Sequence, residues 1–196
     1  MRQYFKFFVY LPFTVIFRLQ CWFSGKIILG SNFEVCGFIL QKNKGTVIVG
    51  DNARINSGRF SNFASGVLTS IQVTNGAKLI IGDRVGISNL AITCVQKIEI
   101  QSDVKIGTDC VISDANFYSL SYVERTVKRF KKTIENVSTA SVEIGNGCFI
   151  GMRVIVLKGV TIGARSVIGA ASVVSSNIEG DSVAVGNPCK RIRGLK

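Results

Sequence analysis

The sequence contains no histidine among its 196 residues, and only two prolines. Without histidine there is no Ser-His-Asp triad, no histidine-ligated zinc and no imidazole general base. Charged residues make up only 18% of the chain and hydrophobic residues 47%, so the composition excludes intrinsic disorder. A chain of this length suits a single folded domain.

Paired cysteine motifs are also missing. Six cysteines occur without any C-x-x-C spacing, at Cys21, Cys36, Cys94, Cys110, Cys148 and Cys189. With no histidine to complete a zinc site, we expect no metal. No secretory signal with a small-residue cleavage site is visible, which predicts reduced thiols in a cytoplasmic protein. We expect most of these cysteines to be small buried hydrophobic residues.

Basic residues outnumber acidic residues by 24 to 12, which gives a formal net charge of +12. This excess predicts an anionic partner: nucleic acid, an acidic membrane surface or a phosphate-bearing ligand. The cations cluster in residues 125–132 and in the tail after residue 189. No nucleic-acid-binding motif accompanies either cluster, so we expect no nucleic acid partner. A solvated loop and a solvated tail remain the simpler interpretation of the two clusters.

Residues 1–24 differ from the rest of the chain. Five of the thirteen phenylalanines lie within residues 5–17, and Arg2, Lys6, Arg18 and Lys26 flank or interrupt the segment. The uncharged run between Lys6 and Arg18 is too short to span a membrane, which takes about 20 residues. Two interpretations stay open. The segment is a helix that caps the hydrophobic core, or it lies at a membrane interface and places the protein at the inner face of the membrane.

A six-residue period governs the second half of the chain. β-branched residues recur six positions apart, at Ile144, Ile150, Val156, Ile162, Ile168 and Val174. A helix with 3.6 residues per turn would scatter these side chains, whereas short strands joined by tight corners can use this period. Three hexapeptides make one triangular coil. The period therefore predicts that Ile144 stacks under Ile162, with strands about 4.8 Å apart.

The same spacing occurs upstream with breaks, for example at Ile100, Ile106 and Ile112. Residues 27–112 and 142–190 together correspond to roughly seven coils. Residues 57–77 are too irregular to place. Residues 113–141 interrupt the repeat, and a loop of this length inside a regular scaffold is usually functional.

The segment VEIGNGCFIGMRVIVLKGVTIGARSVIGAASVVSSNIEGDSVAVGNPCKRIRG resembles the C-terminal half of the hexapeptide-repeat acyltransferases, in their sugar and polysaccharide O-acetyltransferase branch. The resemblance extends upstream through IGDRVGIS and IQSDVKIGTDCVISDANFYSL, and so covers roughly residues 80–194. It implies an all-β fold: a single left-handed parallel β-helix over residues 25–196, with a short N-terminal helix and the inserted loop at 113–141. It also implies a homotrimer, with active sites between subunits and acetyl-coenzyme A along the coils.

In that family, the stretch matching DANFY usually reads Asp-x-Asp-x-His, and the histidine is the general base. Here the catalytic candidates at these positions are Asp114, Asn116 and Tyr118. A phenol with a pKa near 10 is only about one part in a thousand ionised at pH 7. Several interpretations stay open. Asp114 has a raised pKa and acts as the base, a cation such as Arg125 acidifies Tyr118, Tyr118 positions the acceptor without ionising, or the site has lost its base.

The resemblance also assigns binding residues. The acetyl-coenzyme A cleft is expected to be lined by Met152, Ala170, Ser175, Ser176, Lys190 and Arg193. The tail cations suit the 3′-phosphate and the pyrophosphate. The family often has Thr-Lys in place of Ser175-Ser176, so one phosphate-binding cation is missing here. It also often has tryptophan in place of Phe149. Substrate contacts are expected at Ser88, Asn89 and Arg125, and the alternative for the Ser-Asn pair is a polar corner.

Two functions from different classes follow. The first is an acetyl-coenzyme A-dependent O-acetyltransferase that acts on a sugar hydroxyl in surface polysaccharide biosynthesis, with a small-molecule or glycan acceptor. The second is a catalytically silent β-helix subunit, which the missing histidine favours.

Overall fold

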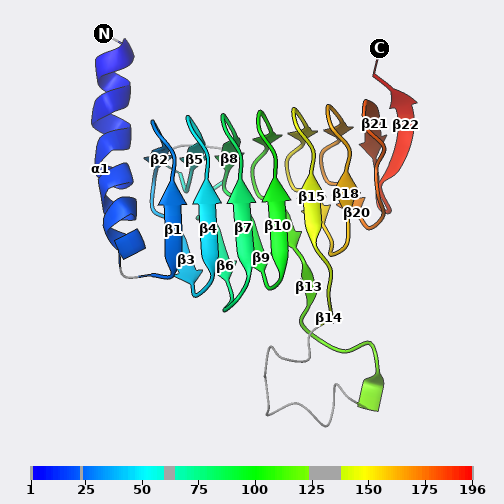
Figure 1. Ribbon diagram of the computed structural model, residues 1–196. Helices are drawn as coiled ribbons and strands as arrows, with labels where there is room; N and C mark the ends of the chain where they lie inside the picture. The colour runs from blue at the N-terminus through cyan, green and yellow to red at the C-terminus, as the bar shows by residue number, and fades with distance from the viewer. Residues whose placement is uncertain (1, 23, 60–64, 124–137, 196) are drawn as a thin grey trace.

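The chain folds into a left-handed parallel β-helix with one helix at its N-terminal end, so the expected fold class is confirmed. The computed structural model describes residues 2–22, 24–59, 65–123 and 138–195. Three sheets, which we name A, B and C, form the faces of a prism, and the helix lies against one end of it (Figure 1).

Each sheet collects one strand from each successive coil. Sheet A contains β1 (Lys26–Leu29), β4 (Thr46–Val49), β7 (Lys78–Ile81), β10 (Lys97–Ile100), β15 (Val142–Ile144) and β18 (Thr161–Ile162). Sheet B contains β2 (Glu34–Cys36), β5 (Arg54–Asn56), β8 (Gly86–Ser88), β11 (Lys105–Ile106), β16 (Phe149–Ile150), β19 (Val167–Ile168), β21 (Ser182–Val185) and β22 (Lys190–Gly194). Sheet C contains β3 (Leu40–Asn43), β6 (Ser70–Val73), β9 (Ala91–Cys94), β12 (Val111–Ser113), β17 (Ile155–Val156) and β20 (Val173–Val174).

The six-residue period places one aliphatic side chain of each strand inside the prism. The predicted stacking is confirmed by the strand register, in the pairs Ile144–Ile162, Ile150–Ile168 and Val156–Val174. All six side chains are fully buried. Burying an isoleucine stabilises a fold by roughly 1.5–3 kcal/mol relative to leaving it exposed, so these columns provide the main driving force for coiling.

Two excursions leave the coils at different corners of the prism. Residues 57–69 leave between sheets B and C, and β6 then resumes the coil, which accounts for the irregular stretch 57–77. Residues 113–141 leave between sheets C and A through a short antiparallel pair, β13 (Ala115–Asn116) and β14 (Ser138–Thr139). Figure 1 shows that β13 and the described residues after it, up to residue 123, lead away from the prism.

The cysteines are free thiols, and all except Cys21 are buried. Burial is the largest cause that raises the pKa of Cys94 to about 12 and that of Cys110 to about 11. Because the thiolate is the reactive form, these thiols stay protonated and behave as small apolar side chains. The expectation that most cysteines are buried is therefore confirmed.

Helix α1 (Arg2–Trp22) covers the first coil with one of its faces. Phe17 is buried, and its ring centroid lies 5.7 Å from that of Phe33. Thr14 Oγ1 accepts a hydrogen bond from the Val35 amide at 2.9 Å. These contacts confirm one of the two interpretations of this segment: this face of the helix caps the hydrophobic core. Among the described residues, no helix combines the length and the apolar character that crossing a membrane requires.

Replacing Phe17 by alanine should lower the free energy of unfolding by about 3–5 kcal/mol, because it removes a buried aromatic side chain from the cap. Leu19→Ala is the matched control: Leu19 is 56% exposed on the same helix, so its loss should cost less than about 0.5 kcal/mol in lipid-free buffer. Chemical denaturation followed by circular dichroism measures both. Equal midpoints for the two variants would show that α1 does not seal the core.

Candidate active site

The outward-facing residues of sheet B form one column along the prism. The strand register aligns them in the order Glu34, Arg54, Gly86, Lys105, Phe149, Val167, Val183 and Arg193. The first seven each stand directly before a buried residue, so the alternation of a strand points them outward. The column is charged towards both ends and apolar between Lys105 and Arg193, which are about 19 Å apart at four strand spacings.

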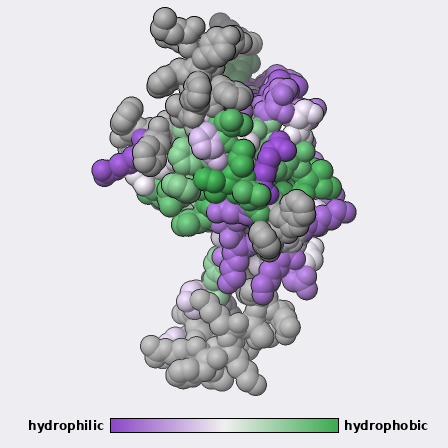
Figure 2. Space-filling view, turned by 90° about the vertical axis from the view of Figure 1, so that its left-hand side faces the viewer, coloured by the Kyte–Doolittle hydropathy of each residue, from purple (hydrophilic) through white to green (hydrophobic). Residues whose placement is uncertain are grey.

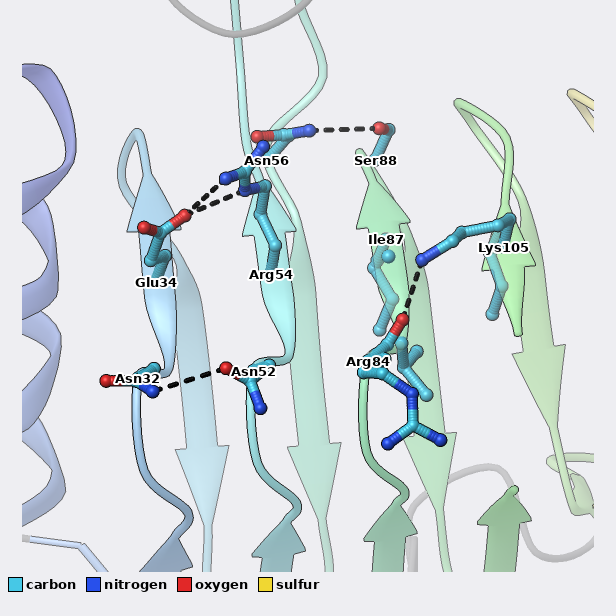
Figure 3. Close-up of a pocket in the computed structure, with 12 residues that line it drawn as sticks. Asn32, Glu34, Asn52, Arg54, Asn56, Arg84, Ile87, Ser88 and Lys105 are labelled. Atoms are coloured by element: carbon cyan, nitrogen blue, oxygen red, sulfur yellow. Dashed lines mark hydrogen bonds and ion pairs between the residues drawn. The ribbon is translucent and has the colours of Figure 1, made fainter. Parts of the chain in front are cut away.

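A groove of about 520 Å³ lies over the N-terminal half of this column (Figure 3). Its polar lining comes from β2, β5, β8, β11 and the corners before them, and consists of Asn32, Glu34, Asn52, Arg54, Asn56, Arg84, Ser88 and Lys105. Gly86 keeps the floor of the groove low, since a Cβ there would lie 3.1 Å from the Lys105 side chain. A concave site of this size with several polar groups suits a small molecule or a short segment of a glycan.

Two cations of the groove are already paired with carboxylates. Arg54 forms an ion pair with Glu34 at 2.5 Å, and Arg84 makes two hydrogen bonds to Asp103, at 2.6 and 2.7 Å. The Arg84 guanidinium holds the pKa of Asp103 below its usual range. Lys105 Nζ donates to the Arg84 carbonyl at 2.6 Å, and no carboxylate of the described chain lies within ion-pair distance of it. Lys105 is therefore the cation most available to an anionic ligand.

The groove ends at the corner between sheets B and C, where Ser88 and Asn89 lie. Ser88 lines the groove, and its hydroxyl accepts a long hydrogen bond from Asn56 Nδ2 at 3.5 Å. Asn89 is only 1% exposed: its Oδ1 accepts from the Gly58 amide at 3.1 Å, and its Nδ2 donates to the Ser65 carbonyl at 3.3 Å. This geometry favours the polar corner for Asn89 and leaves Ser88 as the candidate ligand contact.

Asp114 is fully buried at the point where the long loop leaves the prism. Its two carboxylate oxygens accept hydrogen bonds from the amides of Val95 and Gln96, both at 2.8 Å. A buried carboxylate held by two main-chain donors anchors the chain, and none of its surface is open to a substrate. The geometry therefore favours a structural role for Asp114 over the role of general base.

Asn116 and Tyr118 follow this anchor. Asn116 lies in β13 and is partly exposed, whereas the Tyr118 side chain is 67% exposed next to the exposed ring of Phe117. Arg125, the cation expected near Tyr118, lies outside the described residues. The loop starts at the corner between sheets C and A, whereas the groove lies on sheet B. The coils of one chain therefore do not place Tyr118 at the groove of the same chain.

Two of the expected coenzyme residues meet at the corner between sheets B and C. Met152 and Ala170 occupy equivalent positions in successive coils, and the Ala171 amide donates to the Met152 carbonyl at 2.8 Å. This contact requires glycine at the preceding position, because a Cβ on Gly151 would lie 2.6 Å from the Ala170 amide nitrogen. Both Met152 and Ala170 are exposed, so this corner offers a ligand a shallow surface.

The other four lie elsewhere. Ser175 and Ser176 follow β20 at the corner between sheets C and A, and are exposed. Lys190 and Arg193 are exposed residues of β22, which pairs antiparallel with β21 at the C-terminal edge of sheet B. A ligand bound on sheet B of one chain would therefore lie on the same side of the prism as Met152, Ala170, Lys190 and Arg193. Ser175 and Ser176 lie at a different corner.

Sequence reasoning finds Ser88 but misses the rest of the groove. The groove residues could have been found in the sequence at the positions directly before each inward-facing aliphatic residue. Those positions hold Glu34, Arg54 and Lys105, three charges that the register brings into one column.

Comparison with known proteins identifies the repeat. Residues 141–176 match the family model of the bacterial transferase hexapeptide, described as six repeats. Galactoside O-acetyltransferase of Escherichia coli is 50% identical over 54 residues, which are 28% of this chain and 27% of that protein. The chain thus matches about a quarter of the length of such curated relatives.

Solved structures share the fold over most of the chain. AntD, an N-acyltransferase from Bacillus cereus in complex with dTDP and coenzyme A, aligns over 91% of this chain and 89% of its own, with a TM-score of 0.66 and 20% identity. A hexapeptide-repeat acetyltransferase from Vibrio cholerae complexed with acetyl-coenzyme A aligns over 92% of this chain and 76% of its own, with a TM-score of 0.60 and 24% identity. At these identities the likeness shows the fold.

The coils and their period define a left-handed β-helix protein built from hexapeptide repeats. Within that class, residues 141–176 carry the repeat of the bacterial hexapeptide transferases, in the segment where the sequence resembles the hexapeptide-repeat acyltransferases.

Asp114→Asn should lower the free energy of unfolding by about 1–3 kcal/mol, because the new amide group turns an N–H₂ towards one of two buried main-chain donors. The rate of acetyl transfer per folded molecule should change little. Thermal unfolding and the transfer rate, measured on the same preparation, separate the two effects. An unchanged midpoint together with a rate loss of about 10²–10⁴-fold would instead make Asp114 the general base.

Proposed function

We propose that this protein is an acetyl-coenzyme A-dependent O-acetyltransferase of a sugar hydroxyl, in the biosynthesis of a surface polysaccharide or its lipid-linked precursor. The observation that carries the proposal is the column on sheet B, with a polar groove at one end, an apolar middle and two cations at the other end. The matched segment of the galactoside O-acetyltransferase supports this chemistry, and the coenzyme-bound relatives share the β-helix fold. The unpaired thiols favour the cytoplasm as its compartment.

The coenzyme is assigned to the C-terminal part of the column. Exposed ammonium and guanidinium groups at Lys190 and Arg193 suit the 3′-phosphate and the pyrophosphate. Phe149, which is exposed, together with Val167 and Val183 offers an apolar surface to the pantetheine arm. A coenzyme extended along this line would direct its thioester towards the groove. The proposal includes no metal.

The acceptor is assigned to the groove. Its amide, hydroxyl and charged side chains are the groups that hydrogen-bond to sugar hydroxyls, and Ser88 places a hydroxyl at the end nearest Met152. Lys105 favours acceptors that carry a carboxylate or a phosphate.

The reaction moves an acetyl group from sulfur to oxygen. The acceptor oxygen attacks the thioester carbonyl carbon, the carbon–sulfur bond breaks, and the hydroxyl proton ends on the coenzyme A thiol. In this proposal the Tyr118 hydroxyl hydrogen-bonds to the acceptor and positions it for attack, without acting as the base. Holding donor and acceptor together supplies much of the acceleration without a strong base.

A homotrimer would complete this site. Tyr118 leaves one corner of the prism and the groove lies on another face, so the loop of one chain would meet sheet B of the next. Sheet C supports such packing, since its register aligns the exposed apolar side chains of Leu40, Val111 and Ile155 in one column. Large exposed apolar patches mark association surfaces, and closed threefold symmetry would cover this one in every chain.

The second candidate function is a catalytically silent β-helix subunit. The absence of histidine and the exposed position of Tyr118 favour it. Failure of the purified protein both to bind coenzyme A and to acetylate any sugar would establish this alternative in place of the enzyme.

Tyr118→Phe should slow acetyl transfer by less than about tenfold, because it removes one hydrogen bond worth roughly 1 kcal/mol. Tyr118→His should raise the rate, since an imidazole with a pKa near 6.5 is a neutral base above that pH. The histidine variant should therefore gain activity as the pH rises through about 6.5, a step that the wild type lacks. Release of the coenzyme A thiol in the presence of galactosides and acidic sugars measures these rates. Loss of transfer in Tyr118→Phe without rescue by Tyr118→His would make Tyr118 itself the acid or base.

Two sets of variants should separate the coenzyme from the acceptor. Lys190→Gln combined with Arg193→Gln should weaken coenzyme A binding by roughly tenfold or more, and by less at high salt, because each cation makes a charge-assisted contact to phosphate. Lys105→Gln should leave this affinity unchanged and raise KM for acidic acceptors relative to neutral ones. Calorimetry and steady-state kinetics measure the two effects. Unchanged coenzyme affinity in the double variant would remove the assignment of the tail.

A further inference from the structure

Helix α1 has a second apolar face that points away from the prism. Its inner face carries Phe17 and Thr14 against the first coil, whereas Leu11, Val15, Ile16 and Leu19 on the opposite side are exposed. Residues 11, 15 and 19 are spaced by four, so they form a continuous stripe along the helix. Figure 2 shows this end of the molecule, with hydrophobic residues gathered at the centre of the face and hydrophilic residues around them.

A helix that is apolar on all sides is normally buried on all sides. The inner face of α1 meets this expectation through its ring contacts, Phe17 with Phe33 and Phe13 with Phe38. The outer face is not covered by any part of the chain that the structure describes. The outer face is also dispensable for capping, because the first coil contacts only the opposite side of the helix. Its apolar character therefore needs a partner outside this chain.

The charges around this face indicate what the partner is. Residues 1–33 contain four basic residues (Arg2, Lys6, Arg18 and Lys26) and no acidic residue. Arg18 is exposed on the helix beside Leu19, and Lys26 and Lys44 are exposed close to where the helix joins the first coil. The one acidic side chain shown to act on α1, Glu34 near Tyr10, is paired with Arg54, so the exposed cations Arg18, Lys26 and Lys44 leave this end basic, and an apolar stripe beside them suits an anionic lipid surface. A second copy would bring the same cations face to face, which disfavours a dimer through α1.

We propose that the outer face of α1 docks this protein on an anionic membrane. The helix lies in the plane of the lipid headgroups, with Leu11, Val15 and Leu19 inserted and Arg18 and Lys26 against the phosphates. Because α1 crosses one end of the prism (Figure 1), the β-helix stands on the membrane by its first coil.

Docking also brings the groove of sheet B to the membrane. The groove begins at the first coil, and the guanidinium carbon of Arg54 in its lining lies 4.9 Å from the centroid of the Tyr10 ring on α1. If the proposed acetyltransferase function holds, this arrangement serves an acceptor that is anchored in the membrane by a lipid. The docking itself does not depend on that function, because it rests on the helix alone.

The test is co-sedimentation of the full chain with vesicles of phosphatidylcholine, with and without phosphatidylglycerol. The wild type should bind the anionic vesicles and lose binding as salt increases. Val15→Ser combined with Leu19→Ser should weaken binding by roughly tenfold or more, because two inserted side chains are lost. Leu157→Ser combined with Ile192→Ser is the matched control, since both residues are exposed apolar residues in the C-terminal coils, and it should bind like the wild type.

A second readout is sedimentation of the three proteins without vesicles, which measures self-association. Equal vesicle binding by all three proteins would overturn the proposal. So would an absence of vesicle binding combined with self-association that only the stripe variant abolishes, which would assign the face to a second copy. Neither measurement involves acetyl transfer, so a failure of docking is distinct from a failure of the proposed function.

Discussion

The inward stacking of one aliphatic side chain on the next, coil after coil, is the contact on which the rest of this molecule depends. Ile81, Ile100, Ile144 and Ile162 form one such column inside sheet A, and all are almost completely buried. Once these residues point inward, the residue before each of them must point outward. The site therefore follows from the core: the same register that packs the isoleucines aligns Arg54, Lys105 and Arg193 on the outer face of sheet B.

A stack of coils has two open ends, and the chain closes them differently. At the C-terminal end β22 turns back and pairs antiparallel with β21, so that the last parallel strand of sheet B is not left as a bare edge. At the N-terminal end α1 covers the apolar side chains of the first coil. The helix must be apolar on the side that seals the core, yet its sequence is apolar on the other side as well, and this second side is the surface proposed above for lipid.

Because the chain has no histidine, the candidate site has only other side chains for its chemistry. Asp114 holds the base of the loop through two main-chain amides, and Tyr118 stands beyond it with most of its side chain exposed. In the proposed trimer, this anchored loop base would let the exposed tyrosine present its hydroxyl group to a neighbouring chain. Positioning of the acceptor is the contribution that the proposed function assigns to this tyrosine.

The sequence by itself determined the β-helix, the stacked pairs and the buried thiols, because a strict six-residue period specifies which side chains face inward. For residues 1–24 it left a cap and a membrane-interface segment open, and the tertiary structure shows one face of α1 against the first coil. Only the tertiary structure decided which polar residues are buried and which line the groove. Asn89 is buried because residues 58 and 65 return over its corner, and Asp114 because it meets the amides of Val95 and Gln96 one coil earlier. Such contacts join residues about one coil or more apart along the chain. The sequence pattern around a polar corner residue is the same whether its side chain faces a substrate or the main chain of another coil. The groove, and Lys105 as its cation without a carboxylate partner among the described residues, could therefore be identified only from the stacked coils.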